Sequence, residues 1–450
     1  MAGNLTRLLM CALFCSLSAG AAWADGAVYA MTNAVGNNQI LVFHRAGDGT
    51  LTPIETVPTG GGGSGAQLAT ATLPAVDALG SQGSLQLDKD HHLLFAVNTE
   101  SLAPNDQDCQ EGTITSFFVL PDGSLSFADR VRSGGLYPNS LTVTKLSGTT
   151  TQEQELLYVL NAGGPGANPA CGTNPNITGF KVNQNGRMTL LRGSKRAINP
   201  GPLNGTGSGV NCPPVLFSPE ASFNCGLNPP AFPRSPAEVR FTPDAKHLLV
   251  TVKGTNSIYV FPVGPRGLTR APTITQAPGP AVPSYFGFTF DTSGHVFVTE
   301  LFGTATVIPT GAAGAVSSFT IASDNTLSPI SASVGNKGTA TCWITLEPKR
   351  GQYAYVANNL SNTLASYTVG ADGTLTLLQE VAGSASGPND LAVAAERRAS
   401  FIYALNAGNG TVGGFRIHLA DGSLTPLPTV GGLPPANGPN NGGAQGLAAY

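Results

Sequence analysis

Two stretches near the C-terminus, residues 353–381 and 401–430, share one order of apolar runs and polar breaks. Each opens with an aromatic-rich run that ends in Asn, turns at a corner rich in Asn or Gly, continues in a second run and turns again at Asp-Gly. Asn358 and Asn406 stand 48 residues apart, and Asp372 and Asp421 stand 49 apart. A period of this size predicts an array of similar structural units.

The apolar runs in these units predict short β-strands. Residues 353–357 and 363–368 combine alternation with β-branched and aromatic side chains, and no apolar stripe at helical spacing persists. An Asp-Gly pair between two runs favours the positive φ angles of a tight hairpin turn. Each unit is therefore predicted to be an antiparallel meander.

The same unit recurs seven times along the chain. Its first run ends in Asn in five copies and in a charged residue in two, and these end residues are Asn33, Asn98, Asn161, Lys253, Glu300, Asn358 and Asn406. A further short run precedes most copies but not the first, and residues 443–450 supply the missing run at the C-terminus. We therefore predict an all-β, seven-bladed β-propeller with four antiparallel strands per blade, whose ring is closed by the C-terminal strand pairing with the N-terminal blade.

Alternating strand directions would place the connections of such a ring on two faces. The links between first and second strands, and between third and fourth strands, are predicted to be short turns such as 243–246 and 291–294. The long connections fall on the opposite face, here called the top face, and comprise 60–80, 99–111, 162–175 and 193–236. Long loops on a rigid scaffold often carry binding residues, so we expect function at the top face.

Composition agrees with many short strands and tight turns. Gly occupies 57 of 450 positions, and charged residues make up 11%, less than half of the usual ~25%. The formal net charge of −3 offers no basic surface, so nucleic acid is not an expected partner. We predict one propeller domain over residues 25–450, a monomer, with an insertion at about 193–236 that has too few apolar residues for a second core.

The N-terminus has the features of an export signal. Arg7 precedes an apolar run that begins at Leu8, and Ala22-Trp23-Ala24 forms a small-x-small cleavage site. We expect residues 1–24 to be cleaved and the protein to be periplasmic or secreted. No later apolar run is long enough to span a bilayer.

Five of the seven cysteines would remain after cleavage, and export permits disulfides. Cys212 and Cys225 lie in the insertion, whereas Cys109 and Cys171 lie in top-face loops of neighbouring units. We expect a disulfide in each pair and a buried thiol at Cys342, although spacing does not fix the connectivity. A zinc cluster is the alternative, but no Cys-x-x-Cys or His pair supports it.

Four charged residues are candidates for catalysis. Lys253 and Glu300 replace the Asn at the end of neighbouring units, where they could orient an anionic substrate or shuttle a proton; an ion pair between blades is the alternative. Glu238 and Arg240 share one face of an inner strand, directed at the central channel. They are the first choice for a site, and a structural ion pair is again the alternative.

Other polar groups carry weaker signals. Residues 105–111 alternate acids that could bind Ca²⁺, but they lack the spacing of a calcium loop, so a solvated acidic loop is the simpler interpretation. The histidines fall in outer strands or beside turns opposite the top face, and none is expected to act as a base: His44, His91, His92, His247, His295 and His418. No hydrolase elbow, phosphate loop or dinucleotide fingerprint is present, and no cofactor is expected.

Residues 236–261 and 355–381 together resemble the lactonase-type seven-bladed propellers, a family that includes bacterial phosphogluconolactonase and fungal carboxymuconate lactonising enzyme. In that family the inner strand of the fourth blade typically opens with Pro-His, and the His belongs to the proposed active site. The matching pair here is Pro236-Ala237, so that His is absent. The family's Asp-Leu-Gly after the next strand corresponds here to Val252-Lys253-Gly254.

Two functions follow from this resemblance. In the first, the protein hydrolyses or isomerises a sugar lactone or similar cyclic ester, with Glu238 or Glu300 in place of the missing His. In the second, it is a non-catalytic scaffold that binds a ligand or a protein on its top face. Export argues against a phosphorylated lactone as the substrate.

Overall fold

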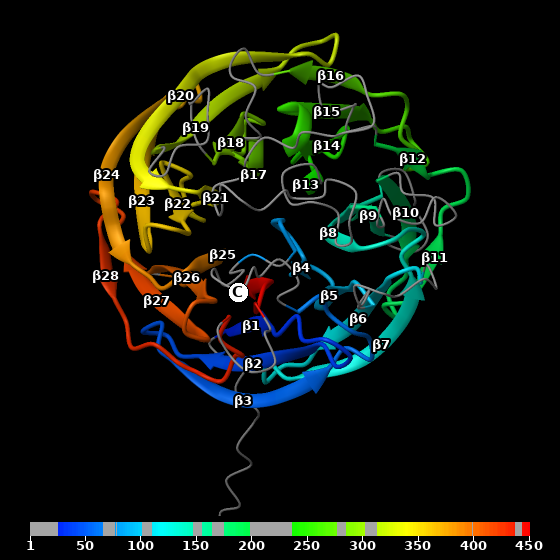
Figure 1. The fold of residues 1–450 in the computed structure, drawn as a ribbon, viewed down its shortest axis with the longest axis horizontal. Coiled ribbons are helices and arrows are strands. Elements are labelled where there is room, and N and C mark those ends of the chain that lie inside the picture. Colours follow the sequence, from blue (N-terminus) through cyan, green and yellow to red (C-terminus); the bar gives the residue numbers. More distant parts are fainter. Residues whose placement is uncertain are drawn as a thin grey trace, which may run out of the picture.

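The chain forms a ring of seven β-sheets around a central axis (Figure 1). The structure is a computed structural model that describes residues 26–65, 77, 79–100, 110–146, 155–163, 175–198, 236–276, 285–301, 313–397, 399–436 and 443–450. Within these residues there are six four-stranded sheets and one five-stranded sheet, all antiparallel. The predicted seven-bladed propeller is confirmed.

The strands of the first three blades are given from the axis outward. Blade one contains β29 (Leu447–Ala449), β1 (Ala27–Met31), β2 (Gln39–Arg45) and β3 (Leu51–Pro58). Blade two contains β4 (Leu85–Asp88), β5 (Leu93–Asn98), β6 (Thr113–Val119) and β7 (Leu125–Arg132). Blade three contains β8 (Pro138–Lys145), β9 (Glu155–Asn161), β10 (Asn176–Val182), and then β11 (Met188–Leu190) and β12 (Arg196–Ala197), which both pair with β10.

The remaining four blades follow the same order. Blade four contains β13 (Pro236–Phe241), β14 (His247–Val252), the 3₁₀ turn η2 (Lys253–Thr255), β15 (Ser257–Pro262) and β16 (Thr273–Gln276). Blade five contains β17 (Tyr285–Phe290), β18 (Val296–Glu300), β19 (Ala313–Ile321) and β20 (Leu327–Thr339). Blade six contains β21 (Thr341–Leu346), β22 (Tyr353–Asn358), β23 (Thr363–Val369) and β24 (Leu375–Ser384). Blade seven contains β25 (Pro388–Ala395), β26 (Ser400–Asn406), β27 (Thr411–Ile417) and β28 (Leu424–Pro426).

The ring closes as the sequence predicts. Strand β29 pairs antiparallel with β1, with Val28 opposite Ala449 and Tyr29 opposite Ala448. Gly446 accepts a further hydrogen bond from the Met31 amide at 2.9 Å. Blade one therefore combines the two ends of the described chain, and its inner edge is covered.

The hydrophobic core lies between the blades. Middle strands such as β5 are buried on both faces, whereas outer strands such as β3 are mostly exposed. One apolar cluster joins blades one, two and three through Tyr29, Phe95 and Val159. Sheets buried on both faces explain why the middle strands are continuously apolar instead of alternating.

A tyrosine on the second strand of four blades ties each of these blades to the next. Its hydroxyl donates to the carbonyl of the Gly in the next blade's outer hairpin turn, at 2.8–2.9 Å: Tyr29 to Gly123, Tyr158 to Gly267, Tyr355 to Gly422 and Tyr403 to Gly49. The turn Gly residues at these positions all have positive φ, which favours glycine. The Asp-Gly and related turns therefore serve as docking points between blades as well as hairpins.

The expectation of short links on the face opposite the top is wrong at one place. Nine residues, 146–154, connect β8 to β9 on that face, and all but Leu146 lie outside the described residues. The expected signal peptide at 1–24 and the four cysteines Cys109, Cys171, Cys212 and Cys225 also lie outside them, as do residues 199–235 of the expected insertion. Among the described residues, no helix has the length and apolar character needed to cross a membrane.

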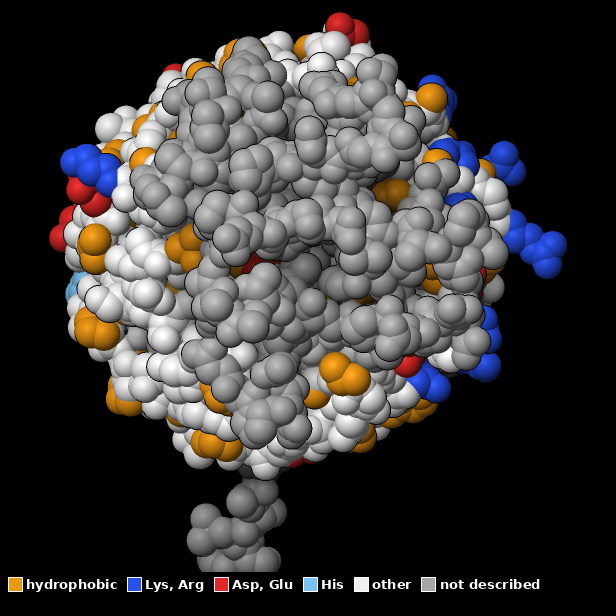
Figure 2. All heavy atoms as spheres, viewed as in Figure 1, with side chains coloured by type: hydrophobic (Ala, Val, Ile, Leu, Met, Phe, Trp, Pro, Cys, Tyr) orange, Lys and Arg blue, Asp and Glu red, His pale blue; other side chains and the backbone are white. Residues whose placement is uncertain are grey.

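Charge is sparse on the described surface. Figure 2 shows Lys and Arg side chains at the rim beside β11 and β12, and charged side chains of both signs at the opposite rim beside β24, where Lys337 pairs with Glu380; the other described side chains in this view are mostly uncharged. This distribution agrees with the low content of charged residues in the sequence.

Candidate functional site

Polar side chains reach the inner wall of the ring because the inner strands are irregular near their first residues. The pairing register shifts there in β8, β13, β17, β21 and β25. Such bulges leave backbone groups unpaired within a blade. Side chains of inner strands also accept backbone N–H groups from the inner strand of the next blade: Ser140 from Val239 at 3.1 Å, Glu238 from Phe288 at 2.6 Å, and Asp390 from Leu447 at 2.9 Å.

Glu238 and Arg240, predicted to face the channel, are paired with each other. The Nε and Nη2 atoms of Arg240 donate to Oε1 of Glu238 at 2.8 and 2.7 Å, while Oε2 accepts the Phe288 amide. Glu238 is fully buried, whereas 27% of the Arg240 side chain is exposed. Burial raises the pKa of Glu238 to about 7, although Arg240 and the Phe288 amide oppose the rise.

Asp390 is a third ionisable group of this wall, and the sequence analysis missed it. Its Oδ1 accepts the Leu391 amide at 2.8 Å and its Oδ2 the Leu447 amide at 2.9 Å. Burial raises the pKa of Asp390 to about 8; the charge of Glu238 adds to this rise and Arg240 opposes it. Asp390 stands two residues after Pro388, as Glu238 stands two after Pro236, so aligning the blades would have revealed it.

The segment ahead of β4, residues 79–84, crosses the centre of the ring (Figure 1). The Gln82 side chain makes two hydrogen bonds with the backbone of Ile344 in blade six, at 3.0 and 3.1 Å. The backbone N–H of Gln82 donates to the carbonyl oxygen of Ala237 in blade four at 3.1 Å. The Ser81 carbonyl accepts from Trp343 Nε1 at 2.9 Å and from Gln445 Nε2 at 2.6 Å. This segment therefore joins inner strands from opposite sides of the ring.

Lys253 supports that central segment. Its Nζ donates to the Gly80 carbonyl and lies over the Phe286 ring, 4.8 Å from the centroid. Burial lowers the pKa of Lys253 to about 8, against the opposing charge of Asp77. A lysine expected at a pocket mouth is thus fully buried.

Glu300 does not form the ion pair with Lys253 that was the alternative to a catalytic role. Its carboxylate accepts the hydroxyls of Ser317 and of Ser333, the latter at 2.8 Å, both from its own blade. Burial raises the pKa of Glu300. The structure therefore brings Glu238 and Arg240 together and leaves Lys253 and Glu300 in separate surroundings.

Two other features are separate from the pair formed by Glu238 and Arg240. Cys342 is a free, buried thiol on inner strand β21, as predicted. A cavity of about 480 Å³ lies between blade two and blade three, and its largely apolar lining includes Glu111, Phe180, Leu190 and Lys195. None of the four predicted catalytic residues lines this cavity.

Comparison with known proteins identifies the family to which this ring is similar. Residues 235–435, which comprise blades four to seven, match a family model described as "Lactonase, 7-bladed beta-propeller". Blades four to seven thus carry the lactonase-type propeller pattern. The resemblance inferred from residues 236–261 and 355–381 is confirmed. None of the curated proteins matches the sequence.

Solved structures share the propeller fold over nearly the whole chain. A Pseudomonas aeruginosa protein described as a periplasmic gluconolactonase is 14% identical, with a TM-score of 0.61 over 94% of this chain and 99% of that one. A Bacteroides fragilis protein with a provisional description as a 6-phosphogluconolactonase is 19% identical, with a TM-score of 0.56 over 94% and 98%. At such identities the likeness concerns the fold alone.

Ala237 occupies the position where the lactonase-type pattern typically has His. Ala237 is fully buried in an apolar cluster with Phe286 and Trp343, and its carbonyl oxygen accepts a hydrogen bond from the backbone N–H of Gln82. In this chain the central segment therefore contacts the strand opening that carries the His in the family.

Proposed function

We propose that this lactonase-type propeller is an exported enzyme that hydrolyses a sugar lactone or similar cyclic ester in its central channel. The observation that carries the proposal is the group formed by Glu238, Arg240 and Asp390. Two buried carboxyl groups have pKa values raised to about 7 and about 8, and both are affected by one guanidinium. Carboxyl groups with shifted pKa values are often found at functional sites.

Opening a lactone ring by water needs three contributions. One group takes a proton from the attacking water, another returns a proton to the ring oxygen as the C–O bond breaks, and a cation or donor stabilises the charge on the carbonyl oxygen. Glu238 in its ionised form suits the first task, and protonated Asp390 suits the second. Arg240, partly exposed, suits the third.

The other two candidates take supporting parts in this proposal. Lys253 holds the central segment through Gly80, and so fixes the position of the inner wall. Glu300 is the second choice of base, because its buried carboxylate also has a raised pKa. The proposed export favours a lactone without a phosphate group, consistent with the periplasmic gluconolactonase description of one structural neighbour.

The test is an assay of lactones with and without phosphate, measuring acid release by the purified protein. We expect kcat/KM to fall by about 100-fold or more in Glu238→Gln and Asp390→Asn. Glu347→Gln is the matched control, because Glu347 is also buried but lies at the end of an inner strand in blade six. Equal losses in all three variants, or no turnover of any lactone, would contradict the proposal.

A non-catalytic scaffold that binds a ligand on the top face is the second candidate function. This function is favoured because both carboxyl oxygens of Glu238 and both of Asp390 already accept hydrogen bonds from the protein. Saturable binding of a lactone or a sugar without turnover, unchanged in Glu238→Gln, would support it over the enzyme.

A further inference from the structure

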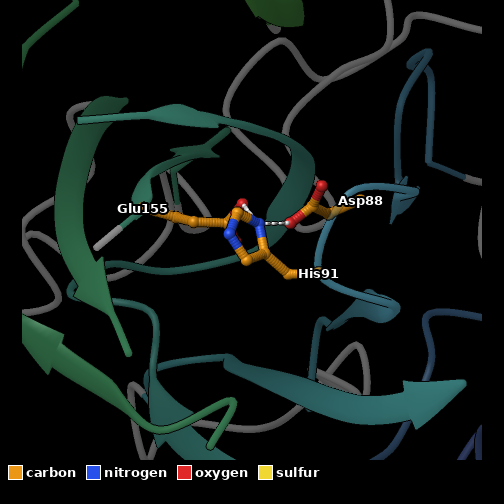
Figure 3. Close-up of side chains that lie close together, drawn as sticks. All are labelled: Asp88, His91 and Glu155. Carbon is orange, nitrogen blue, oxygen red and sulfur yellow. Dashed lines mark hydrogen bonds and ion pairs between the residues drawn. The ribbon is translucent and has the colours of Figure 1, made fainter. Parts of the chain in front are cut away.

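Asp88, His91 and Glu155 form a compact group on the face opposite the top, where blade two meets blade three (Figure 3). Asp88 ends inner strand β4, His91 follows in the turn to β5, and Glu155 begins β9 in the next blade. His91 Nδ1 lies 2.9 Å from Asp88 Oδ2 and 2.6 Å from Glu155 Oε1. One possible ligand atom from each residue lies within 4.8 Å of the others.

The corresponding contact between blades six and seven joins residues of a different chemical type. Ser400 begins the second strand of blade seven, as Glu155 does in blade three, and its hydroxyl donates to Glu347 Oε1 at 3.1 Å. There a donor meets an acceptor. Between blades two and three an acid meets an acid, so a proton or a cation between them is needed to offset their repulsion.

Glu155 is unusual in a second respect. It is only 3% exposed, and its Oε2 is buried and accepts no hydrogen bond from the described residues. A buried carboxylate oxygen without a donor is costly. Figure 3 shows the Glu155 side chain directed at His91 and, beyond it, Asp88.

We infer that Asp88, His91 and Glu155 bind a divalent metal ion that ties blade two to blade three. The ligands would be one imidazole nitrogen, Nδ1 of His91, and oxygens of the two carboxylates. The side chains of Asp88 and His91 are 11% and 12% exposed, so the site is open to solvent for entry of the ion and for a water ligand.

One nitrogen and several oxygen ligands favour a metal ion that is intermediate between hard and soft. Imidazole nitrogen suits Zn²⁺ and related transition metals, whereas carboxylates alone would suit Ca²⁺ or Mg²⁺. Three protein ligands with an open position are common for Zn²⁺, and Mn²⁺ accepts the same mixed set. Binding requires a deprotonated Nδ1, so the ion would replace a proton and release it to the buffer.

The experiment uses the full-length, tag-free protein after treatment with EDTA and dialysis. Zn²⁺, Mn²⁺ and Ca²⁺ are each titrated calorimetrically at neutral pH, in two buffers of different ionisation enthalpy. We expect one Zn²⁺ or Mn²⁺ per chain, proton release, and a Tm that rises with metal concentration. Ca²⁺ is expected to bind at least tenfold more weakly.

Two variants and a matched control localise the site. His91→Ala and Glu155→Gln are expected to weaken binding at least tenfold and abolish the Tm shift. His295→Ala should bind like the wild type, because His295 pairs with Asp291 at 2.6 Å in the corresponding turn of blade five but has no third ligand among the described residues. If a variant fails to fold, the visible spectrum of the Co²⁺-loaded wild type still reports the ligand set.

No binding by the wild type, or equal binding by all variants, would overturn the inference. In that case a proton shared between the carboxyl groups of Asp88 and Glu155 offsets their repulsion, and Glu155→Gln should stabilise the protein without any metal. Tight binding of Ca²⁺ but not Zn²⁺ would also contradict the ligand set assigned here.

Discussion

The Asp390 carboxylate accepts the backbone N–H of Leu447 at 2.9 Å, which links the inner strand of blade seven to the C-terminal strand that completes blade one. Asp390→Ala removes this acceptor and leaves a buried N–H without a partner, at a cost of about 1–3 kcal/mol in the free energy of unfolding. Amide exchange at residues 447–449 should accelerate more than elsewhere. Asp421→Ala, in an exposed turn, is the control and should not change exchange at these residues.

Stability should fall as the pH rises from about 5 to about 8. The pKa values of Glu238 and Asp390 in the folded protein, about 7 and about 8, exceed the ordinary values of 4.5 and 3.8, so folding favours their protonated forms. Their contribution is complete at low pH and is lost as the pH rises through the folded pKa values. Each carboxyl group then lowers the free energy of unfolding by at most about 1.4 kcal/mol for every pH unit crossed. Urea unfolding at several pH values measures this slope.

The variants Glu238→Gln and Asp390→Asn should flatten the slope between pH 5 and 8. A slope of opposite sign, or one that both variants leave intact, would show that these carboxyl groups do not titrate as their burial indicates.

The tyrosine contacts between blades should contribute similar amounts to stability. A Tyr→Phe substitution removes one buried hydrogen bond to a turn carbonyl. We expect each of the variants Tyr29→Phe, Tyr355→Phe and Tyr403→Phe to lower the free energy of unfolding by about 1 kcal/mol. Tyr29 and Tyr355 lie in different blade pairs, so the losses in the double variant should add. Denaturant titration checks both points, and Tyr353→Phe, whose ring is partly exposed, serves as the control.

Tryptophan fluorescence should report on the central segment. The chain has two tryptophans, and Trp23 lies in the expected signal peptide, so Trp343 is the single one in a chain that begins at Asp25. Trp343 is fully buried and donates to Ser81, so its emission should be blue-shifted in the folded protein. A lactone bound in the channel should change this emission, and Trp343→Phe should remove the signal. An emission typical of solvent-exposed tryptophan would contradict the packing of residues 79–84.

Alkylation of cysteines should separate the buried thiol from the expected disulfides. Burial raises the pKa of the Cys342 thiol well above its ordinary value, so it should react only after denaturation. Peptide mapping without reduction should link Cys212 to Cys225 and Cys109 to Cys171. A disulfide that includes Cys342 would contradict both its burial and the expected pairing.

The fold was predictable because its signals are local and repeated. Asp-Gly turns such as 372–373 and 421–422 mark hairpins, and the missing run before Val28 points to the C-terminus for its partner. The pairing of Ala449 with Val28 confirms that interpretation.

The site was less predictable because its contacts join strands that are far apart in the sequence. Glu238 and Arg240 stand two apart on one strand, so their pairing could be expected. Gln82 reaches Ile344, and Glu155 reaches His91, across distances that no local pattern encodes. The end position shared by Lys253 and Glu300 suggested a common role, but Lys253 contacts a central segment whose path the repeat does not reveal.

The pairing of β29 with β1 also dictates when the molecule can finish folding. Blade one has only three strands, β1, β2 and β3, until residues 447–449 pair with β1, so the ring cannot close before that pairing forms. Folding intermediates in which residues 447–449 are not yet paired would expose the edge of β1, where strands of other chains could pair and cause aggregation. Pairing of residues 447–449 with β1 is therefore the contact that completes the ring of seven sheets.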